Sequence, residues 1–194
     1  MNVGIYIYDQ AEVLDFSGPF EVFSTATRVS PGDDPFNVFL VAESTNTITA
    51  RAGYRVLPDY GFNDHPQIDV LIVAGGVYTE EIKKPQVIKW ISHQADSASI
   101  VASVCTGAFL LAKAQLIHAQ QVTTHWEDIA DLKSMFPTLQ VIQGVRWVDQ
   151  GKIITSGGIS AGIDMSLHLV DRLYGRALAE KTARQMEFWW TENS

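Results

Sequence analysis

The chain of 194 residues contains one cysteine, Cys105, and its surroundings suit a nucleophile. It follows the apolar run Ile100-Val101-Ala102-Ser103-Val104 and precedes Thr106-Gly107 and a helix-like segment at 108–114. At such a turn the helix dipole and free backbone N–H groups favour thiolate over thiol. The pattern predicts a nucleophile elbow in which the N–H of Thr106 contributes to an oxyanion hole. The alternative is structural, because free cysteine is also among the most buried residue types.

Two further stretches place polar or small residues at strand ends. The apolar run from Asp69 to Ala74 ends in Gly75-Gly76, and Asp15 lies between an opening strand and a helix. Ligands of open parallel sheets bind where strands give way to loops, so both stretches are candidates for the same site. Each also has a structural interpretation: the glycines suit a tight turn with positive φ, and aspartate is a preferred helix N-cap.

These residues need a scaffold, and the chain predicts one in which short apolar runs alternate with amphipathic segments. Strands are predicted at 3–8, 37–42, 47–50, 54–57, 69–74, 100–104, 121–123, 139–142, 145–149 and 152–155. Helices are predicted from near Pro19 onward and at 85–95, 108–114, 127–135, 160–174 and 177–189. Buried strands interleaved with helices favour an α/β fold with a mostly parallel sheet covered on both faces.

Composition limits the classes of function. With 46% hydrophobic and 19% charged residues, the chain fits a single domain spanning 1–194. A formal charge of −8 argues against nucleic acid as a partner, since phosphate binding relies on Lys and Arg. One cysteine, no leader pattern and no apolar run of about 18 residues predict a cytoplasmic protein that does not bind a membrane.

Five motifs in order resemble the ThiJ/PfpI superfamily, which has the class I glutamine amidotransferase fold. They are Leu14–Pro19 (LDFSGP), Gly75-Gly76, Ala102–Ala108 (ASVCTGA), Thr123–Trp126 (TTHW) and Thr155–Asp164 (TSGGISAGID). The matches extend from residue 3 to about residue 174, nearly the whole chain. The resemblance implies a flavodoxin-like three-layer α/β/α sandwich with a mostly parallel central sheet and a cysteine nucleophile elbow.

Within the superfamily, the sequence is most similar to isonitrile hydratases and to the amidotransferase-like domains of AraC-type transcription regulators. Those regulators carry an additional helix-turn-helix domain, and we expect this chain to lack one because it stops at Ser194. The intracellular peptidases of the superfamily have histidine directly after the cysteine, where this chain has Thr106. The hydratases keep Cys-Thr together with the Asp of Leu-Asp-x-x-Gly-Pro, as Cys105, Thr106 and Asp15 do here.

The resemblance implies a cysteine-dependent hydratase or hydrolase of small molecules, in which Asp15 lies beside Cys105. A carboxyl group that shares a proton with a thiol can protonate an isonitrile carbon while the sulfur attacks it, and water then releases an N-substituted formamide. Backbone N–H groups of Gly75, Gly76 and Thr106 are the predicted oxyanion donors, and the Thr106 hydroxyl is expected to hold water or the substrate nitrogen. This chemistry requires neither a metal nor an organic cofactor, and the resemblance also implies a homodimer.

Other residues are of second rank. His125, Ile159 and Ser160 fall near the expected site, although a lone histidine is more often a hydrogen-bonded core residue. Asp164 suits the first turn of a helix and receives no chemical role. The candidate pocket walls are Phe16, Tyr78, Trp126 and Ile159. The aromatic run Phe188-Trp189-Trp190 packs either on the sheet or in a dimer contact.

Two other functions remain open within the same fold, because fold does not determine function. One is a glyoxalase or deglycase that acts on reactive dicarbonyls through Cys105, an activity that usually accompanies a glutamate where this chain has Asp15. The other is a non-enzymatic redox or ligand sensor in which a low-pKa Cys105 is oxidised without turnover. The identity of the physiological substrate does not follow from the sequence.

Overall fold

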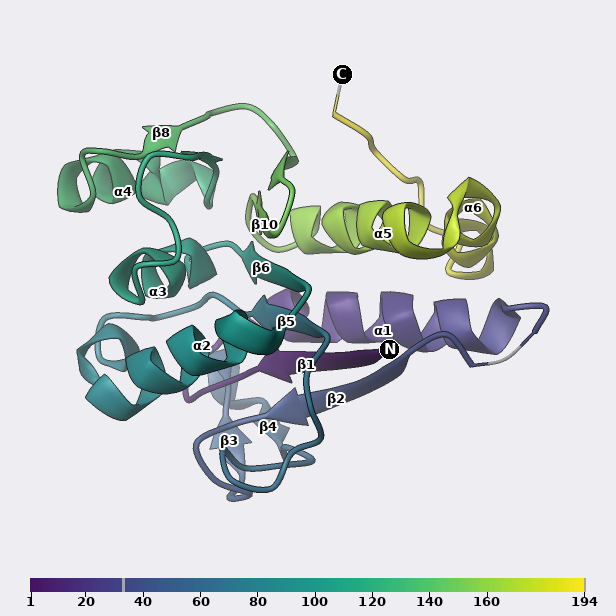
Figure 1. Cartoon of the computed structure of the whole chain (residues 1–194), viewed down its shortest axis with the longest axis horizontal. Helices are drawn as coiled ribbons and strands as arrows, with labels where there is room; N and C mark the ends of the chain where they lie inside the picture. Colours follow the sequence, from purple (N-terminus) through teal and green to yellow (C-terminus); the bar gives the residue numbers. More distant parts are fainter. Residues whose placement is uncertain (33, 194) are drawn as a thin grey trace.

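A central six-stranded sheet in the order β2-β1-β5-β6-β10-β9 organises the computed structural model, which describes residues 1–32 and 34–193 (Figure 1). Every neighbouring pair is parallel except β10 and β9, which are antiparallel. The sheet strands are β1 (Asn2–Tyr6), β2 (Asn37–Val41), β5 (Val70–Val73), β6 (Ile100–Val104), β9 (Trp147–Gln150) and β10 (Ile153–Ser156). The predicted α/β class with a mostly parallel sheet is confirmed.

Helices cover this sheet, and its strand order assigns them to faces. The α-helices are α1 (Val13–Val29), α2 (Pro85–Ser97), α3 (Gly107–Lys113), α4 (Ile129–Met135), α5 (Ala161–Tyr174) and α6 (Arg176–Gln185). The step from β1 through α1 to β2 moves along the sheet in the opposite direction to the step from β5 through α2 to β6. Because parallel crossovers are right-handed, α1 and α2 lie on opposite faces. Helices α5 and α6 pack with α1.

The strand order reverses between β1 and β5, and this reversal positions the candidate site. Loops after neighbouring strands diverge to opposite faces there, which leaves a crevice outside the carboxyl ends of the strands. Asp15 follows β1, Gly75 follows β5, and Cys105 follows β6, the next strand. The predicted meeting of these residues at one edge of the sheet is therefore a consequence of the topology.

Smaller elements complete the chain outside the central sheet. The strands predicted at 47–50 and 54–57 are present as β3 (Ile48–Thr49) and β4 (Arg55–Val56), and the 3-10 turn η1 (Arg51–Gly53) closes them into a hairpin. A parallel pair joins β7 (Gln121–Val122) to β8 (Gln140–Val141). The 3-10 turns η2 (Glu81–Lys83) and η3 (Trp126–Asp128) precede α2 and α4.

The core lies on both faces of the sheet because its central strands carry small or apolar side chains throughout. Every residue of β5 and β6 is buried. Gly107 begins α3 directly above β5, and a Cβ at this position would lie 2.2 Å from the carbonyl oxygen of Val73. Glycine therefore lets α3 approach the sheet closely, which brings its first turn to the strand ends.

Two helix boundaries differ from the sequence prediction by more than two residues. Helix α1 begins at Val13, so Asp15 lies in its first turn and Pro19 lies inside the helix rather than near its start. The proline lacks the N–H that would otherwise bond to the carbonyl of Asp15. Helix α6 ends at Gln185 instead of extending to Trp189, because the chain turns away with a positive φ of 50° at Glu187.

The aromatic end of the chain divides between two environments. Phe188 and Trp190 pack against the core, and the guanidinium of Arg176 lies 4.3 Å from the centre of the Trp190 ring. Trp189 is 92% exposed. Packing against the protein thus accounts for two of the three aromatic residues.

The described residues contain neither a helix that could span a bilayer nor a cluster of side chains that could hold a metal ion. No helix within residues 1–32 and 34–193 has both the length and the apolar character needed to cross a bilayer. In the same part of the chain, no cluster of three or more His, Cys, Asp or Glu side chains is arranged to hold a metal ion.

Candidate active site

Cys105 occupies a strained turn between β6 and α3. Its φ is +57°, an uncommon conformation for a residue with a side chain, which costs on the order of 1–3 kcal/mol. Neighbours hold this conformation, because the Cys105 N–H donates to the Gly157 carbonyl at 3.2 Å and the Thr124 hydroxyl donates to the Cys105 carbonyl at 2.8 Å. The geometry is that of the predicted nucleophile elbow, with the residue 6% exposed.

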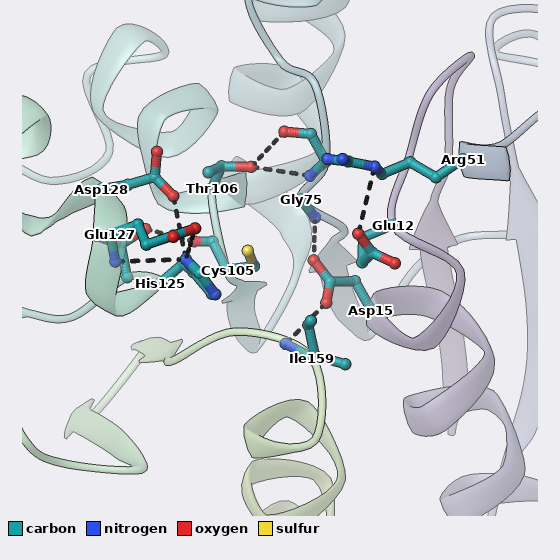
Figure 2. A network of polar contacts seen from close by, with 12 residues as sticks. Glu12, Asp15, Arg51, Gly75, Cys105, Thr106, His125, Glu127, Asp128 and Ile159 are labelled. Atoms are coloured by element: carbon teal, nitrogen blue, oxygen red, sulfur yellow. Dashed lines mark hydrogen bonds and ion pairs between the residues drawn. The ribbon is translucent and has the colours of Figure 1, made fainter.

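Asp15 faces this elbow from the first turn of α1. Its carboxyl is fully buried and accepts hydrogen bonds from the N–H of Gly75 at 3.1 Å and of Ile159 at 3.0 Å (Figure 2). The thiol of Cys105 lies close enough to this carboxyl for each group to shift the pKa of the other. The side chain makes no capping contact, and the N-cap position belongs to Glu12. The alternative of Asp15 as a simple helix cap is therefore wrong.

Burial dominates the electrostatics of this pair. Loss of hydration raises the pKa of Asp15 to about 7, although the N–H groups of Ile159 and Gly75 and the Cys105 thiol lower it. Burial and the neighbouring Asp15 carboxylate also raise the pKa of the Cys105 thiol well above its usual range. The N–H of Thr106 acts in the opposite direction but is outweighed. Burial and Asp15 thus oppose the effect of the helix dipole that was expected to favour the Cys105 thiolate, and α3 has only seven residues.

The glycine turn after β5 does not leave its N–H groups free. The N–H of Gly75 is donated to Asp15. The N–H of Gly76 is donated to the Thr106 hydroxyl at 2.8 Å, and this hydroxyl donates in turn to the Gly76 carbonyl at 2.8 Å. The prediction of Gly75 and Gly76 as free oxyanion donors is thus corrected, and so is that of a free Thr106 hydroxyl. The Thr106 N–H, the third predicted donor, lowers the pKa of the Cys105 thiol.

Gly75 and Gly158 have a second role, which is to allow close approach. A Cβ on Gly75 would lie 2.6 Å from the Thr106 nitrogen and 2.8 Å from both an Asp15 carboxyl oxygen and the Cys105 Cβ. A Cβ on Gly158 would lie 3.3 Å from the Cys105 sulfur and 2.2 Å from Cδ2 of His125. Glycine at these two positions lets the acid, the thiol and the imidazole converge.

His125 lies on the side of Cys105 opposite to Asp15 (Figure 2). Its Nδ1 accepts the N–H of Glu127 at 3.4 Å and lies 3.4 Å from a carboxylate oxygen of Asp128. It therefore caps η3, as a structural histidine does, and also borders the site. Its second-rank place near the nucleophile matches this position.

Ile159 and Ser160, the other second-rank residues, form hydrogen bonds with different partners. Ile159 has a φ of +56°, which is rare for a β-branched residue, and it contributes its backbone N–H to Asp15. The hydroxyl of Ser160 accepts from the guanidinium of Arg146 at 3.2 Å. Ser160 lines a neighbouring cavity that shares His125 and Ile159 with the cavity at Cys105, so it lies near the site without lining it.

A cavity of about 430 Å³ opens above the thiol. Tyr78 and Ile159 line it as expected, whereas Phe16 is buried in the core and Trp126 borders the neighbouring cavity. Several charged residues that line this cavity were not predicted from the sequence, because they lie in turns with no motif of their own. These are Glu12, Arg51, Glu127 and Asp128.

Similarity to known proteins assigns this chain to a family. The family model described as the DJ-1/PfpI family matches residues 1–172. The chain belongs to the DJ-1/PfpI family. Among its members, an isonitrile hydratase from Pseudomonas putida is 33% identical over 190 residues, which cover 97% of this chain and 78% of the relative. In this DJ-1/PfpI chain, Cys105 lies at a strained elbow beside Asp15.

Other relatives of this DJ-1/PfpI chain differ in kind. The transcriptional regulator GbdR of Pseudomonas aeruginosa is 27% identical over 92% of the chain, which spans only 48% of the regulator. A ThiJ/PfpI family protein from Pseudomonas syringae superposes with a TM-score of 0.86 at 24% identity, over 96% of this chain and 74% of that one. Drosophila melanogaster DJ-1beta gives a TM-score of 0.82 at 17% identity, over 97% and 98% respectively. These structures confirm the fold.

Proposed function

We propose that the protein is a cysteine-dependent hydratase that adds water to an isonitrile and forms an N-substituted formamide. The observation that carries the proposal is the buried, adjacent pair of Asp15 and Cys105, in which the acid has a pKa of about 7. Such an acid is poised to give and to take a proton at neutral pH. The isonitrile hydratase from Pseudomonas putida, 33% identical, supports the choice of substrate class.

The reaction begins from the pair with one shared proton. Asp15 delivers this proton to the terminal carbon of the isonitrile, and the sulfur of Cys105 forms a bond to the same carbon. The product is a thioimidate on Cys105, with Asp15 left as a carboxylate. The N–H groups of Gly75 and Ile159 stabilise this carboxylate, because hydrogen bonds to a charged acceptor favour the charged form.

Water then releases the product. Asp15 accepts a proton from water as the water oxygen attacks the thioimidate carbon, and Asp15 then passes this proton to the substrate nitrogen. The resulting tetrahedral adduct collapses by breaking the carbon–sulfur bond, which gives the formamide and returns one proton to the Asp15–Cys105 pair. The sum is one isonitrile and one water converted to one formamide, and no metal or organic cofactor takes part. Homodimerisation stays a prediction.

Two alternatives act at the same cysteine. A glyoxalase or deglycase would add the Cys105 sulfur to an aldehyde carbon, with Asp15 in place of the usual glutamate. A redox sensor needs an exposed thiolate, and this is disfavoured by the 6% exposure of Cys105 and by the raised pKa of its thiol. A ligand sensor is supported by the regulators among the relatives.

The test is formamide production from a neutral alkyl isonitrile, followed by NMR. Wild type should turn over, and Asp15→Asn and Cys105→Ala should each lose at least about 100-fold in kcat/KM, because each removes a reacting group. Ser103→Ala is the matched control, because Ser103 is buried in β6 near the elbow and its hydroxyl has no hydrogen-bond partner among the described residues. Absence of turnover by folded wild type, or full activity of Cys105→Ala, would refute the proposal.

A further inference from the structure

Within the segment 157–160, the N–H of Ile159 donates to the carboxyl of Asp15. Arg146 forms hydrogen bonds with both ends of this segment. The carbonyl of Arg146 accepts the N–H of Gly157 at 2.9 Å. Its guanidinium donates to the hydroxyl of Ser160 at 3.2 Å. One residue outside the active-site cavity therefore contacts both limits of the loop that completes the site.

The residues between these limits need such support. Gly158 packs against Cys105 and His125, and Ile159 has a φ of +56°. A β-branched residue with positive φ is strained, and the conformation persists only where the surroundings impose it. The Asp15 carboxyl imposes it from one side through its hydrogen bond to the Ile159 N–H. Arg146 is the support on the other side.

Arg146 is itself fixed by a buried acid and by the end of the chain. Its Nε donates to the carboxylate of Asp164 at 2.8 Å, and its Nη2 also contacts this carboxylate. Asp164 is fully buried and accepts the N–H of Thr191 at 2.7 Å. The side chain of Asn193 accepts the N–H of Arg146 at 2.8 Å. Asp164, to which the sequence analysis gave no role, thus anchors the guanidinium.

We propose that Arg146 is a positioning residue that, anchored by Asp164, holds the Ile159 N–H on the carboxylate of Asp15. The inference goes beyond isonitrile hydration, since it concerns the protonation of the Asp15–Cys105 pair whatever the substrate. Removing the guanidinium lets Ile159 relax, and the lost hydrogen bond disfavours the charged form of Asp15. The other groups that face Asp15, namely Glu12, Tyr8 and Cys105, stay in place.

The experiment follows the titration of the Asp15 side-chain carboxyl by 13C NMR, with the resonance assigned by its loss in Asp15→Asn. In Arg146→Met, the midpoint should rise by about 0.5 to 1 pH unit, the size expected when one of several hydrogen bonds to a carboxylate is lost. Arg172→Met is the matched control: Arg172 also pairs with an aspartate, and its side chain is 34% exposed, as is that of Arg146. It should titrate as wild type does.

A second variant guards against loss of folding. Ser160→Ala removes the contact between the guanidinium and the hydroxyl but keeps the pair of Arg146 and Asp164. It should shift the midpoint in the same direction by a smaller amount. A purely structural role for Arg146 would lower the melting temperature and leave the midpoint unchanged. Folded Arg146→Met with the wild-type midpoint, or Ser160→Ala with no shift where Arg146→Met does not fold, would overturn the proposal.

Discussion

The carboxyl of Asp15, in the first turn of α1, and the thiol of Cys105, at the end of β6, lie beside each other and are both buried. Burial disfavours the charged form of each group, so the pair loses its first proton only at about pH 7 and keeps the second to high pH. The pair is thereby both an acid and a source of sulfur nucleophile. Its environment, more than the short helix α3, decides its reactivity.

Turnover should depend on the protonation of this pair. The reaction proposed above starts with one shared proton, so kcat/KM should rise as pH increases through about 7, where Asp15 loses its proton. It should fall again only at high pH, because the raised pKa of Cys105 delays loss of the second proton. The check is a profile of kcat/KM from pH 5 to 10. A decline with increasing pH through neutrality would contradict the one-proton form.

Stability should also depend on pH through Asp15. Its pKa is raised from 3.8 to about 7 on folding, so the native state binds more protons than the unfolded state between these values. The contribution is fully present below the unfolded pKa and is lost as pH rises to about 7, on the order of 4 kcal/mol at most. Urea unfolding of wild type and Asp15→Asn at pH 4.5 and 7.5 tests this. The free energy of unfolding of wild type relative to that of the variant should be lower at pH 7.5 than at pH 4.5. The same difference at both pH values would contradict the prediction.

Gly75→Ala should separate the acid from the thiol. The added Cβ would lie within 2.8 Å of the Thr106 nitrogen, an Asp15 oxygen and the Cys105 Cβ, so the groups around it must move. We expect at least about a 100-fold loss of kcat/KM, since displacements near 1 Å are that costly. Gly32→Ala is the control, because nothing lies within 4 Å of its added Cβ. Equal kinetics for the two variants would show that the approach at Gly75 is unimportant.

The charge of the cavity should select among substrates. Glu12, Glu127 and Asp128 line it, and its one described cation, Arg51, lies 3.5 Å from Glu12. An isonitrile with a carboxylate should therefore have a lower kcat/KM than a neutral one of equal size, and one with an ammonium group a higher one, with a difference that shrinks as salt increases. Asp128→Asn should reduce the discrimination. Preference for the anionic substrate would rule out this effect.

A buried acid away from the site should control part of the stability. Glu81 is 3% exposed, hydrogen bonds with Tyr6 and pairs with Lys84 at 2.9 Å. Lys84→Met leaves this charge uncompensated and should cost about 2 kcal/mol, below the value for a fully buried pair because Lys84 is 38% exposed. Lys83→Met, which breaks an exposed pair with Glu80, should cost less than about 0.5 kcal/mol. Urea unfolding compares them, and equal losses would contradict the burial argument.

The sequence by itself determined the sheet, the elbow and the family. Apolar runs such as Ile100–Val104 and small residues after them are local signals, and β6 has the predicted bounds. The positions of Asp15, Gly75 and Cys105 at strand ends followed, because parallel strands end at a common edge. The family resemblance added that Asp15 lies beside Cys105.

Only the tertiary structure decided the protonation of the pair and the partners of each backbone N–H. The pKa of Cys105 depends on burial and on Asp15, and both come from segments far from the helix start that suggested a thiolate. Gly76 and Thr106 satisfy each other across two loops, and Ile159 reaches Asp15 from a third. Asp164 ends one of the family motifs, but no local pattern in the sequence pairs it with Arg146. Desolvation and long-range hydrogen bonds depend on which segments meet, and local sequence patterns do not record that.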